Sequence, residues 1–498
     1  MRRSRVFRYA AALAAAMALV AASGCGDGGK ASKTTFTYWR ASEISLEDIP
    51  FSRELEKRNN VIIEYIYPQP GNVQEQLNIL YYSDNLPDMI ETDWESINFG
   101  AESAINNGYI LRLDDLIEKY SPNLKEYLLN HPDDANKIRT SQGYFAYPFI
   151  RSDESLKVYY GPCIRGEWLD KLGLEMPETL DEWHNVLSRF KNEFGCEAPL
   201  AMSIYSDYLM YAFRISDGFY IEDGVVKYGF TEPAYRDYLE MMNTWYEEGL
   251  LGENFPNTVY TNNTIEMFKN NYCGIAFDTA GKGIGAALKA GMDVRGLKYP
   301  VLNKGEKPFS SNYSDTNTTI GAVSISGNCK DPAAAAKFLD FGYSEEGMLF
   351  YNFGVLGESY IMTEEGPIYT ELITQSDDTN NAMNRYIRAN GSGPFIQMKA
   401  YMDQYASAPQ QKEALSNWGY SDAKVHCIPN LLFTEQEHIE LSNLTYFNYV
   451  FETKLDFILG IKDLSEFDEY IETAYEKGVG KALEIYNNAY NEYLTKQR

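Results

Sequence analysis

Histidine and cysteine are scarce in this sequence of 498 residues, which contains four of the former and six of the latter. The histidines form no H-E-x-x-H pair and the cysteines form no C-x-x-C pair, so neither a metal site nor a disulfide framework is predicted. The phosphate-binding pattern G-x-x-x-x-G-K-[ST] and the nucleophile pattern G-x-S-x-G are also missing. We therefore expect no catalytic residues, no metal and no cofactor.

Basic side chains are also few for a chain of this length. Lysine and arginine number 44 against 71 aspartates and glutamates, which gives a net charge of −27. A nucleic-acid-binding protein needs a basic surface to neutralise phosphates, so we expect no nucleic-acid partner. Long apolar runs are equally rare. The longest covers residues 10–22, which is shorter than the ~20 apolar residues that a membrane-spanning helix needs.

The N-terminus has the parts of a bacterial export signal in the right order. Four arginines precede the apolar run of residues 10–22, and the sequence A-S-G-C, ending at Cys25, follows it. This order resembles the signal of bacterial lipoproteins, in which small residues precede a cysteine that becomes lipidated. We expect a signal peptide over 1–24, lipidation of Cys25 and a flexible tether over 25–33, with the chain held at the outer face of the cytoplasmic membrane. The alternative is an ordinary secretory signal in which Cys25 has no role.

Segments typical of strands alternate with helical patterns after the tether. Strands are expected over residues 36–39, 61–67 and 86–91, with helices over 46–58 and 73–82 between them. Strands separated by helices of about ten to fifteen residues indicate βαβ units and a mainly parallel sheet. The sequence therefore predicts an α/β protein, in which ligands bind beyond the carboxyl ends of the strands.

Further along the chain, helix starts and changes of composition suggest more than one lobe. The sequence T-L-D-E at 179–182 has the form of a capping box, and Asp331 and Ser344 precede two more expected helices. The composition changes over 142–161 and again over 305–319, and we interpret these segments as crossings between two lobes. A chain of this length is expected to form more than one lobe.

Aromatic side chains are abundant, with 40 tyrosines, 25 phenylalanines and 6 tryptophans. A tyrosine or tryptophan ring offers an apolar face and a polar tip, which suits the C–H patches and hydroxyls of a sugar. Our candidate ligand contacts are the rings and aspartates that follow expected strands or lie at the crossings, namely Trp39, Asp93, Trp94, Tyr147, Tyr160, Asp207, Tyr208, Phe277 and Asp278. The alternative is that these rings cover seams between helices and sheets while the aspartates face solvent.

Motifs in both expected lobes carry a family resemblance. They are L-P-D-M-I at 86–90, the pair of segments 165–174 and 177–183, and the helix pair at 331–340 and 344–347. In their order and spacing they resemble the bacterial extracellular solute-binding proteins of the large, sugar-importing type, the group that includes maltose-binding protein. The resemblance implies a two-lobed, periplasmic-binding-protein-like fold of type II. Each lobe would be a mainly parallel sheet flanked by helices, and hinge strands would join the lobes.

The resemblance also implies a division of the chain and a function. The N-terminal lobe would comprise residues 34–150 and 308–352, and the C-terminal lobe residues 151–307 and 353–498. The protein would be a monomeric binding protein rather than an enzyme, and it would capture an oligosaccharide between the lobes and deliver it to the permease subunits of an ABC importer. It would touch the membrane through its lipid anchor only. The alternative is a lipid-anchored glycan-processing enzyme, a hydrolase or lyase, because a catalytic carboxylate pair is defined by its distance in space.

Two local patterns refine this expectation. The sequence G-K-G-I-G-A at 281–286 imitates a dinucleotide-binding fingerprint but lacks the acidic residue that should follow ~20 positions later. In the family this turn would face the cleft, where its amides could donate to a ligand hydroxyl. Residues 190–199 are too poor in carboxylates to form the calcium loop that many relatives carry.

Overall fold

The computed structural model describes residues 33–42, 44–69, 73–82, 85–94, 100–258, 264–311, 313, 320–376 and 378–496. These ranges leave out the expected signal peptide, Cys25 and all of the tether but its last residue. They also leave out residues 312 and 314–319 of the second expected crossing. Within the described part of the chain, no helix is both long enough and apolar enough to cross a membrane.

The first sheet contains four strands in the order β13-β3-β1-β2. Their bounds are Thr34–Trp39 for β1, Val61–Ile66 for β2, Met89–Asp93 for β3 and Ile320–Ile325 for β13. β1 pairs in parallel with β2 and β3, whereas β13 runs antiparallel to β3. The helices α2 (Pro50–Asn59) and α3 (Val73–Tyr81) connect the parallel strands, as the alternation predicts.

The second sheet has the order β12-β7-β11-β8. Its strands are Tyr160–Arg165 for β7, Leu200–Ala201 for β8, Ile275–Thr279 for β11 and Val294–Gly296 for β12. β11 is parallel to β8, and both β11 and β12 are antiparallel to β7. In this sheet, as in the first, three strands share one direction and one is reversed. The expected mainly parallel sheets are therefore found, each with a reversed strand that the sequence did not predict.

The two reversed strands arise at different places in the chain. β13 follows the strands of the second sheet, so no helical crossover within the first sheet leads into it. β7 is the first strand of the second sheet and runs opposite to β8, although the helices Gly166–Leu172 and Leu180–Phe194 lie between them. A second difference concerns α2, which was expected to begin at residue 46 and begins at Pro50. Proline fits the first turn of a helix and holds the residue before it extended, as Ile49 is with ψ of 155°.

The three helix caps that the sequence indicates, at Thr179, Asp331 and Ser344, are confirmed. Asp331 caps α13 (Pro332–Asp340) and Ser344 caps α14 (Glu345–Phe353), each through its side-chain oxygen. The T-L-D-E sequence opens α9 (Leu180–Phe194) with a complete capping box. Other helices that matter below are α8 (Gly166–Leu172), α10 (Ala234–Glu247), α16 (Thr379–Tyr386), α17 (Lys399–Tyr405), α18 (Pro409–Gly419), α20 (Glu435–Ser442), α21 (Tyr446–Ile458), α22 (Phe467–Glu476) and α23 (Val479–Lys496).

The capping box of α9 leads to the first prediction. The hydroxyl of Thr179 accepts a hydrogen bond from the backbone N–H of Glu182 at 3.2 Å, and α9 buries five side chains against the second sheet's core. Thr179→Ala should therefore lower the free energy of unfolding by about 1 kcal/mol, measured by urea denaturation. Thr434→Ala is the matched control, because Thr434 makes the same box at α20, a helix with no buried side chain. An equal loss of stability in both variants would contradict this account.

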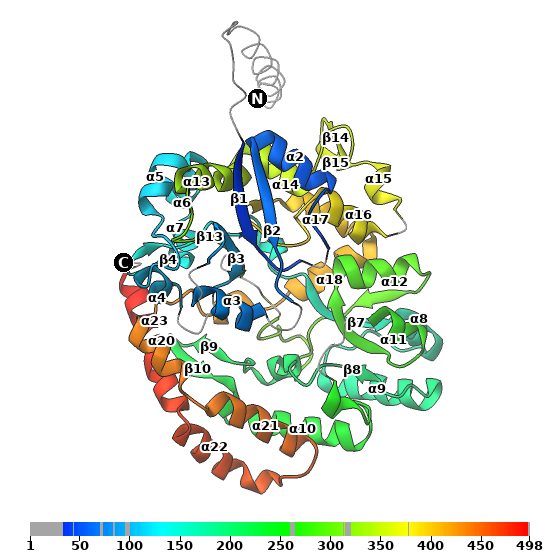
Figure 1. The fold of residues 1–498 in the computed structure, drawn as a ribbon. Coiled ribbons are helices and arrows are strands. Elements are labelled where there is room, and N and C mark those ends of the chain that lie inside the picture. The colour runs from blue at the N-terminus through cyan, green and yellow to red at the C-terminus, as the bar shows by residue number, and fades with distance from the viewer. Residues whose placement is uncertain are drawn as a thin grey trace, which may run out of the picture.

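Buried side chains form two hydrophobic cores. One draws on residues 36–150, 322–351 and 395–396, and the other on residues 156–309, 353–389 and 401–479. Figure 1 shows the corresponding halves, with α2 and α14 beside β1 and β2 in one, and α8 and α9 beside β8 in the other. We propose that these cores are the two lobes. Phe395 and Ile396, which lie within the expected C-terminal lobe, pack in the first core, so the chain returns to it once more.

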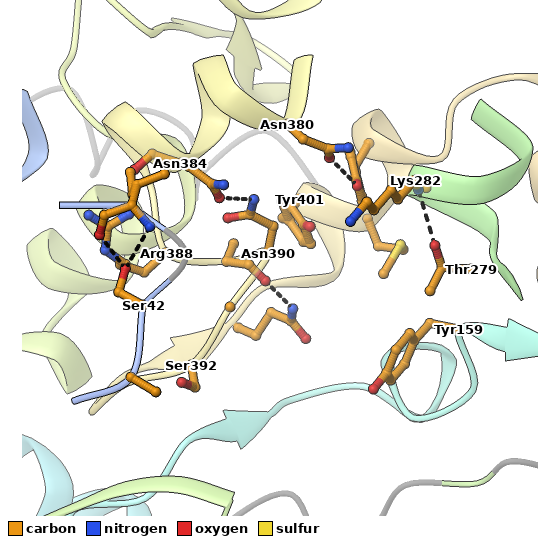
Figure 2. Close-up of a pocket in the computed structure, with 18 of the residues that line it drawn as sticks. Ser42, Tyr159, Thr279, Lys282, Asn380, Asn384, Arg388, Asn390, Ser392 and Tyr401 are labelled. Carbon is orange, nitrogen blue, oxygen red and sulfur yellow. Dashed lines mark hydrogen bonds between the residues drawn. The ribbon is translucent and has the colours of Figure 1, made fainter. Parts of the chain in front are cut away.

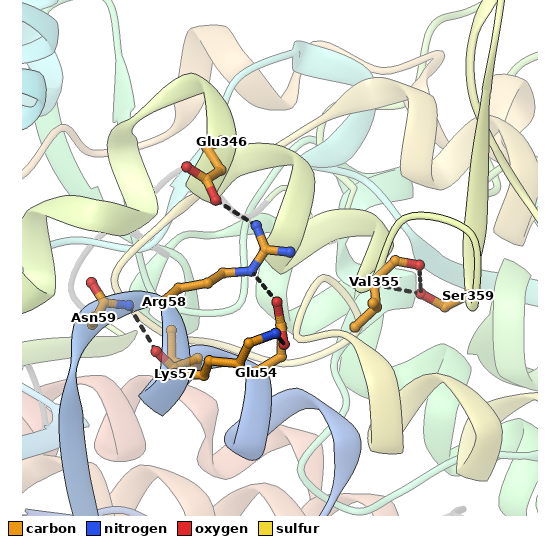
Figure 3. Close-up of polar contacts among 8 residues, drawn as sticks. Glu54, Lys57, Arg58, Asn59, Glu346, Val355 and Ser359 are labelled. Carbon is orange, nitrogen blue, oxygen red and sulfur yellow. Dashed lines mark hydrogen bonds and ion pairs between the residues drawn. The ribbon is translucent and has the colours of Figure 1, made fainter. Parts of the chain in front are cut away.

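An ion-pair network fixes α2 to α14 on the outside of the first core. Figure 3 shows Arg58 between two carboxylates, with its Nε 3.0 Å from Glu54 and its Nη1 2.5 Å from Glu346. The guanidinium also lies 5.0 Å from the centre of the Phe350 ring. After α14, the hydroxyl of Ser359 accepts from the N–H of Val355 at 2.7 Å and closes the turn at 357–360. These contacts lie away from the lining of the cavities described below.

Candidate functional site

A cavity of about 660 Å³ lies between the two cores, and we call it the polar cavity. Its walls come from the loop after β1, the turn after β11, and the segment that carries α16 and α17. Figure 2 shows Ser42 and Arg388 on one side, and Thr279, Lys282 and Tyr159 on the other. The volume lies in the range of roughly 300–1,000 Å³ that is typical of small-molecule sites.

A buried carboxylate organises the wall on the side of the first core. Glu91, in β3, is 5% exposed and accepts hydrogen bonds from the hydroxyls of Tyr38 at 2.6 Å and Ser392 at 2.7 Å. Its Oε2 also pairs with Nη1 of Arg40 at 3.2 Å. Because both Arg40 and Ser392 line the polar cavity, this one side chain joins two segments of the wall that are far apart in sequence.

Arg388 is the most buried cation of the same wall, with 5% of its surface exposed. Its guanidinium carbon lies 4.2 Å from the centre of the Phe51 ring, and its Nη1 donates to the carbonyl of Asn384 at 2.7 Å. Among the described residues, its Nε and Nη2 have no hydrogen-bond partner. Burial, with the charge of Arg40, lowers the pKa of Arg388 to about 10, so the side chain remains protonated at neutral pH.

The opposite wall is the turn that follows β11. The hydroxyl of Thr279 accepts from the N–H of Lys282 at 3.2 Å, and the side-chain amide of Gln411 in α18 donates to the carbonyl of Ala280 at 2.7 Å. Gly281 and the exposed Lys282 line the polar cavity. The expectation that this glycine-containing turn faces the cleft is therefore confirmed.

Amide side chains and tyrosine rings complete the lining. Nδ2 of Asn390 donates to Oδ1 of Asn384, and the hydroxyl of Tyr405 donates to Oδ1 of Asn380, each at 2.6 Å (Figure 2). The rings of Tyr401 and Tyr405 stack with their centres 5.4 Å apart. Amides both donate and accept, and rings offer flat apolar surfaces, so this wall has the two kinds of contact that a polyhydroxylated ring requires.

A second cavity, of about 600 Å³, also lies between the cores, and we call it the aromatic cavity. Trp94 and Phe145 from the first core face it together with Phe219, Phe433 and Tyr486. The rings of Phe219 and Tyr486 stack at 4.1 Å. Hydrogen bonds between the lobes lie near it, such as that from Nδ2 of Asn430 to the carbonyl of Lys137 at 2.7 Å.

The predicted contacts of the N-terminal lobe lie at or behind the cleft. Trp94 lines the aromatic cavity, where its indole N–H donates to the carbonyl of Ala322 at 3.3 Å. Asp93 is half-buried at the end of β3. Trp39 is 3% exposed in the first core, and Tyr147 is fully buried there with its hydroxyl 2.7 Å from that of Ser121. None of these four lines the polar cavity.

The predicted contacts of the C-terminal lobe lie beside or within the second core. The ring of Tyr208 contacts those of Tyr160 and Phe277, with ring centres 6.0 and 5.0 Å away. Asp278 is half-buried, and burial raises its pKa. Asp207 is paired with Lys454 at 2.7 Å. None of these five lines the polar cavity either, and a direct role of any predicted residue in ligand binding remains a prediction.

The sequence analysis missed most of the residues that line the polar cavity. Arg40, Tyr159 and Thr279 each adjoin a predicted residue, so the expected strand ends do border the polar cavity. Arg388 and Asn390 come from a segment without any recognisable motif. The one local signal is an arginine between the apolar residues at 387 and 389, a pattern that is common on protein surfaces.

Comparison with known proteins places the chain among transport proteins. The model of the family described as bacterial extracellular solute-binding protein matches residues 45–349. The lipoprotein LipO of Bacillus subtilis is 23% identical over 470 residues, covering 89% of this chain and 88% of LipO. The fructooligosaccharide ABC transporter substrate-binding protein FusA of Streptococcus pneumoniae is 24% identical over 488 residues, covering 89% of this chain and 86% of FusA.

Solved structures show the same fold. The alginate-binding protein AlgQ2, in its crystal structure without calcium ion, aligns with a TM-score of 0.77 at 23% identity, covering 92% of this chain and 98% of that chain. A solute-binding protein of Bifidobacterium longum infantis, described as binding HMO, aligns with a TM-score of 0.74 at 20% identity, covering 93% and 99%. The fold is thus the α/β, periplasmic-binding-protein-like fold of type II. Because the family model matches more than half of its length, the chain belongs to the bacterial extracellular solute-binding proteins.

Proposed function

We propose that this protein is a lipid-anchored solute-binding protein that captures an oligosaccharide between its lobes and delivers it to the permease subunits of an ABC importer. The observation that carries the proposal is the polar cavity, whose wall combines asparagine amides with tyrosine rings. A sugar presents hydroxyls at its edge and C–H groups on its faces, and these match amides and rings respectively. The position between two cores allows both lobes to contact one ligand, which favours a closed form.

The names of the relatives support an oligosaccharide as the solute. FusA is named for fructooligosaccharides and AlgQ2 for alginate, and a Bacillus subtilis relative that matches 45% of this chain is named for polygalacturonan and rhamnogalacturonan. These glycans differ in their sugars and in their charge. They support the general class of ligand for this chain without choosing one member of it.

The rival proposal, a glycan-processing enzyme, is not favoured by the lining of the polar cavity. Hydrolysis of a glycosidic bond by the usual routes needs two carboxyl groups roughly 5–9.5 Å apart beside the bond. None of the described residues that line this cavity is an aspartate or a glutamate. The family is one of binding proteins, and we propose that this member has no enzymatic activity.

A thermal-shift screen tests the proposal. The chain without residues 1–25 is heated in the presence of neutral and acidic oligosaccharides and, as controls, of free amino acids and short peptides. A ligand that binds only the folded state stabilises it by mass action and so raises the melting temperature. At a ligand concentration of 100 times Kd, the free energy of unfolding increases by about 2.7 kcal/mol. We expect at least one oligosaccharide to raise it and the other solutes to leave it unchanged. A response to peptides alone would refute the proposed ligand class.

The lipid anchor is a separate prediction, since Cys25 lies outside the described residues. Cys25→Ser should release the protein into the medium or leave an unprocessed precursor, because no acyl chains can be attached to serine in this position. More than one chain is expected on the cysteine, since a single chain holds a protein at a membrane only marginally. Fractionation of cells followed by immunoblotting measures the outcome. Normal processing with unchanged membrane retention would show that Cys25 is incidental.

A further inference from the structure

The polar cavity is lined by basic side chains in a strongly acidic protein. Arg40, Arg151, Lys282 and Arg388 line it, while none of its described lining residues is acidic. In the whole sequence, acidic residues outnumber basic ones by 71 to 44. Composition therefore does not account for a cleft wall on which every charged side chain that the structure describes is basic. A wall of this kind attracts anions, because a low-dielectric cleft concentrates the field of the charges that line it.

Arg388 is the side chain that most requires a further partner. It is 5% exposed, and its one hydrogen-bonded nitrogen, Nη1, donates to backbone carbonyls. No carboxylate pairs with it among the described residues, and two of its nitrogens, Nε and Nη2, have no acceptor there. A buried charge without a partner is costly, and protein structures normally pair it. The ring of Phe51 covers one face of the guanidinium and compensates only part of this cost.

The charges behind the wall leave an excess of positive charge. Among the described residues, Glu91 is the carboxylate whose charge acts on both guanidinium groups, and its oxygens are already shared among Arg40, Tyr38 and Ser392. The mutual repulsion of Arg40 and Arg388 is visible as a lowered pKa of Arg388, to which burial makes the larger contribution. One carboxylate thus faces two guanidinium groups, and a second anion would balance them.

We infer that the oligosaccharide held by the polar cavity carries anionic groups, either uronate carboxylates or sulfate esters, and that Arg388 and Lys282 bind them. This inference rests on the proposed function and narrows its ligand class. A guanidinium presents N–H groups in a planar fork that matches two oxygens of a carboxylate or sulfate. Lys282, on the opposite wall, is exposed at the turn after β11 and supplies a second cation. The asparagine amides between them suit the neutral hydroxyls of the same ligand.

Titration calorimetry with matched glycans tests the inference. The panel pairs each uronate oligosaccharide, such as trigalacturonate and trimannuronate, with its methyl ester, and each sulfated disaccharide with its unsulfated form. At least one acidic member should bind about tenfold or more tightly than its neutral counterpart, the scale of one charge-assisted hydrogen bond. Added salt should weaken the acidic member and leave the neutral one unchanged. If the acidic glycan that binds most tightly is a uronate, the site is selective for carboxylates, and if it is a sulfated disaccharide, the site is selective for sulfate esters.

Single-site variants connect the selectivity to the wall. Arg388→Gln and Lys282→Gln should each weaken binding of the acidic glycan by about tenfold and change binding of its neutral counterpart by less than about threefold. Lys57→Gln is the matched control, because it removes a positive charge from an exposed side chain of α2 that does not line the cavity. Since Lys282 is exposed, its variant is informative even if Arg388→Gln fails to fold.

The outcomes separate this inference from the proposed function. Neutral glycans that bind as tightly as their acidic counterparts would overturn the inference and leave the proposed function intact. Variants that weaken the acidic and neutral forms equally would overturn the role of the two cations. Binding of no glycan in the calorimeter or in the thermal screen would refute the proposed function, and the inference with it.

Discussion

Lys454→Met should lower the free energy of unfolding by about 3–5 kcal/mol, the cost of leaving one member of a buried ion pair alone. Nζ of Lys454, in α21, lies 2.7 Å from Oδ2 of Asp207 and 2.8 Å from the carbonyl of Ile204. The two side chains are 2% and 7% exposed. Without the ammonium, the carboxylate of Asp207 stays buried, and among the described side chains the hydroxyl of Tyr238, at 2.8 Å, is the one that still donates to it.

The neighbourhood makes this loss more severe. Asp207, Asp217 and Lys454 together line a small cavity of about 100 Å³, and the pKa of Asp217 is raised by burial and by the negative charge of Asp207. Removing Lys454 leaves the negative charge of Asp207 unbalanced beside the buried Asp217. The pair also ties α21 to the segment after β8, so its loss should loosen the C-terminal helices from the second core.

Equilibrium unfolding in urea measures the effect, with Lys462→Met as the control. Lys462 lies in the loop after α21 and pairs with Glu466 at 3.1 Å, but both side chains are solvent-exposed to a considerable degree. Water screens such pairs, so the control should be close to the wild type. The double variant Lys454→Met/Asp207→Leu should recover much of the stability, because it buries neither charge. Equal midpoints for the Lys454 and Lys462 variants would contradict the assignment.

Trp418→Ala should be about as damaging, lowering the free energy of unfolding by about 3–5 kcal/mol and weakening ligand binding as well. Trp418 is fully buried at the end of α18, and its indole N–H donates to the carbonyl of Pro162 in β7 at 3.0 Å. β7 approaches so closely that a Cβ on Gly161 would lie 2.5 Å from Cδ1 of the indole. The ring therefore fills the space between α18 and the second sheet.

Binding should suffer because α18 also holds the wall of the polar cavity. Gln411, in the first turn of the same helix, donates to the carbonyl of Ala280 and so fixes the turn after β11. Trp418→Phe, which keeps a ring, should lose less stability and retain affinity.

Gly161→Ala tests the same contact from the side of β7 and should lower the free energy of unfolding by about 1–3 kcal/mol through overpacking. Urea unfolding gives the stabilities, and calorimetry with a glycan from the screen gives the affinities. If the Trp418→Ala protein bound the glycan with wild-type affinity, α18 would not be needed to hold the wall of the polar cavity.

Features of the fold that depend on neighbouring residues were predictable from the sequence. The T-L-D-E box at 179–182 and the caps at Asp331 and Ser344 act within one helical turn, so the pattern itself specifies them. The directions of β7 and β13 were not predictable in this way. They depend on pairing with strands distant in sequence, β7 with β11 and β12, and β13 with β3, which is a property of the whole topology.

The site shows the same division. Strand ends were located correctly, but adjacent residues at a strand end point in different directions, and a sequence does not show which one faces the ligand. Trp39 and Tyr160 were chosen for their rings, whereas Arg40 and Tyr159 line the polar cavity. Arg388 could not be found, because its burial follows from a late return of the chain to the first core, where Phe395 is packed.

The central claim is that an oligosaccharide is held in the polar cavity, and a crystal structure of the complex with the tightest glycan from the screen tests it most directly. The account predicts sugar density in contact with the loop after β1 at Arg40 and Ser42, with Arg388 and with the turn at Thr279–Lys282, so that both lobes touch the ligand. Density confined to the aromatic cavity beside Trp94 and Phe433, with the polar cavity holding solvent alone, would contradict it.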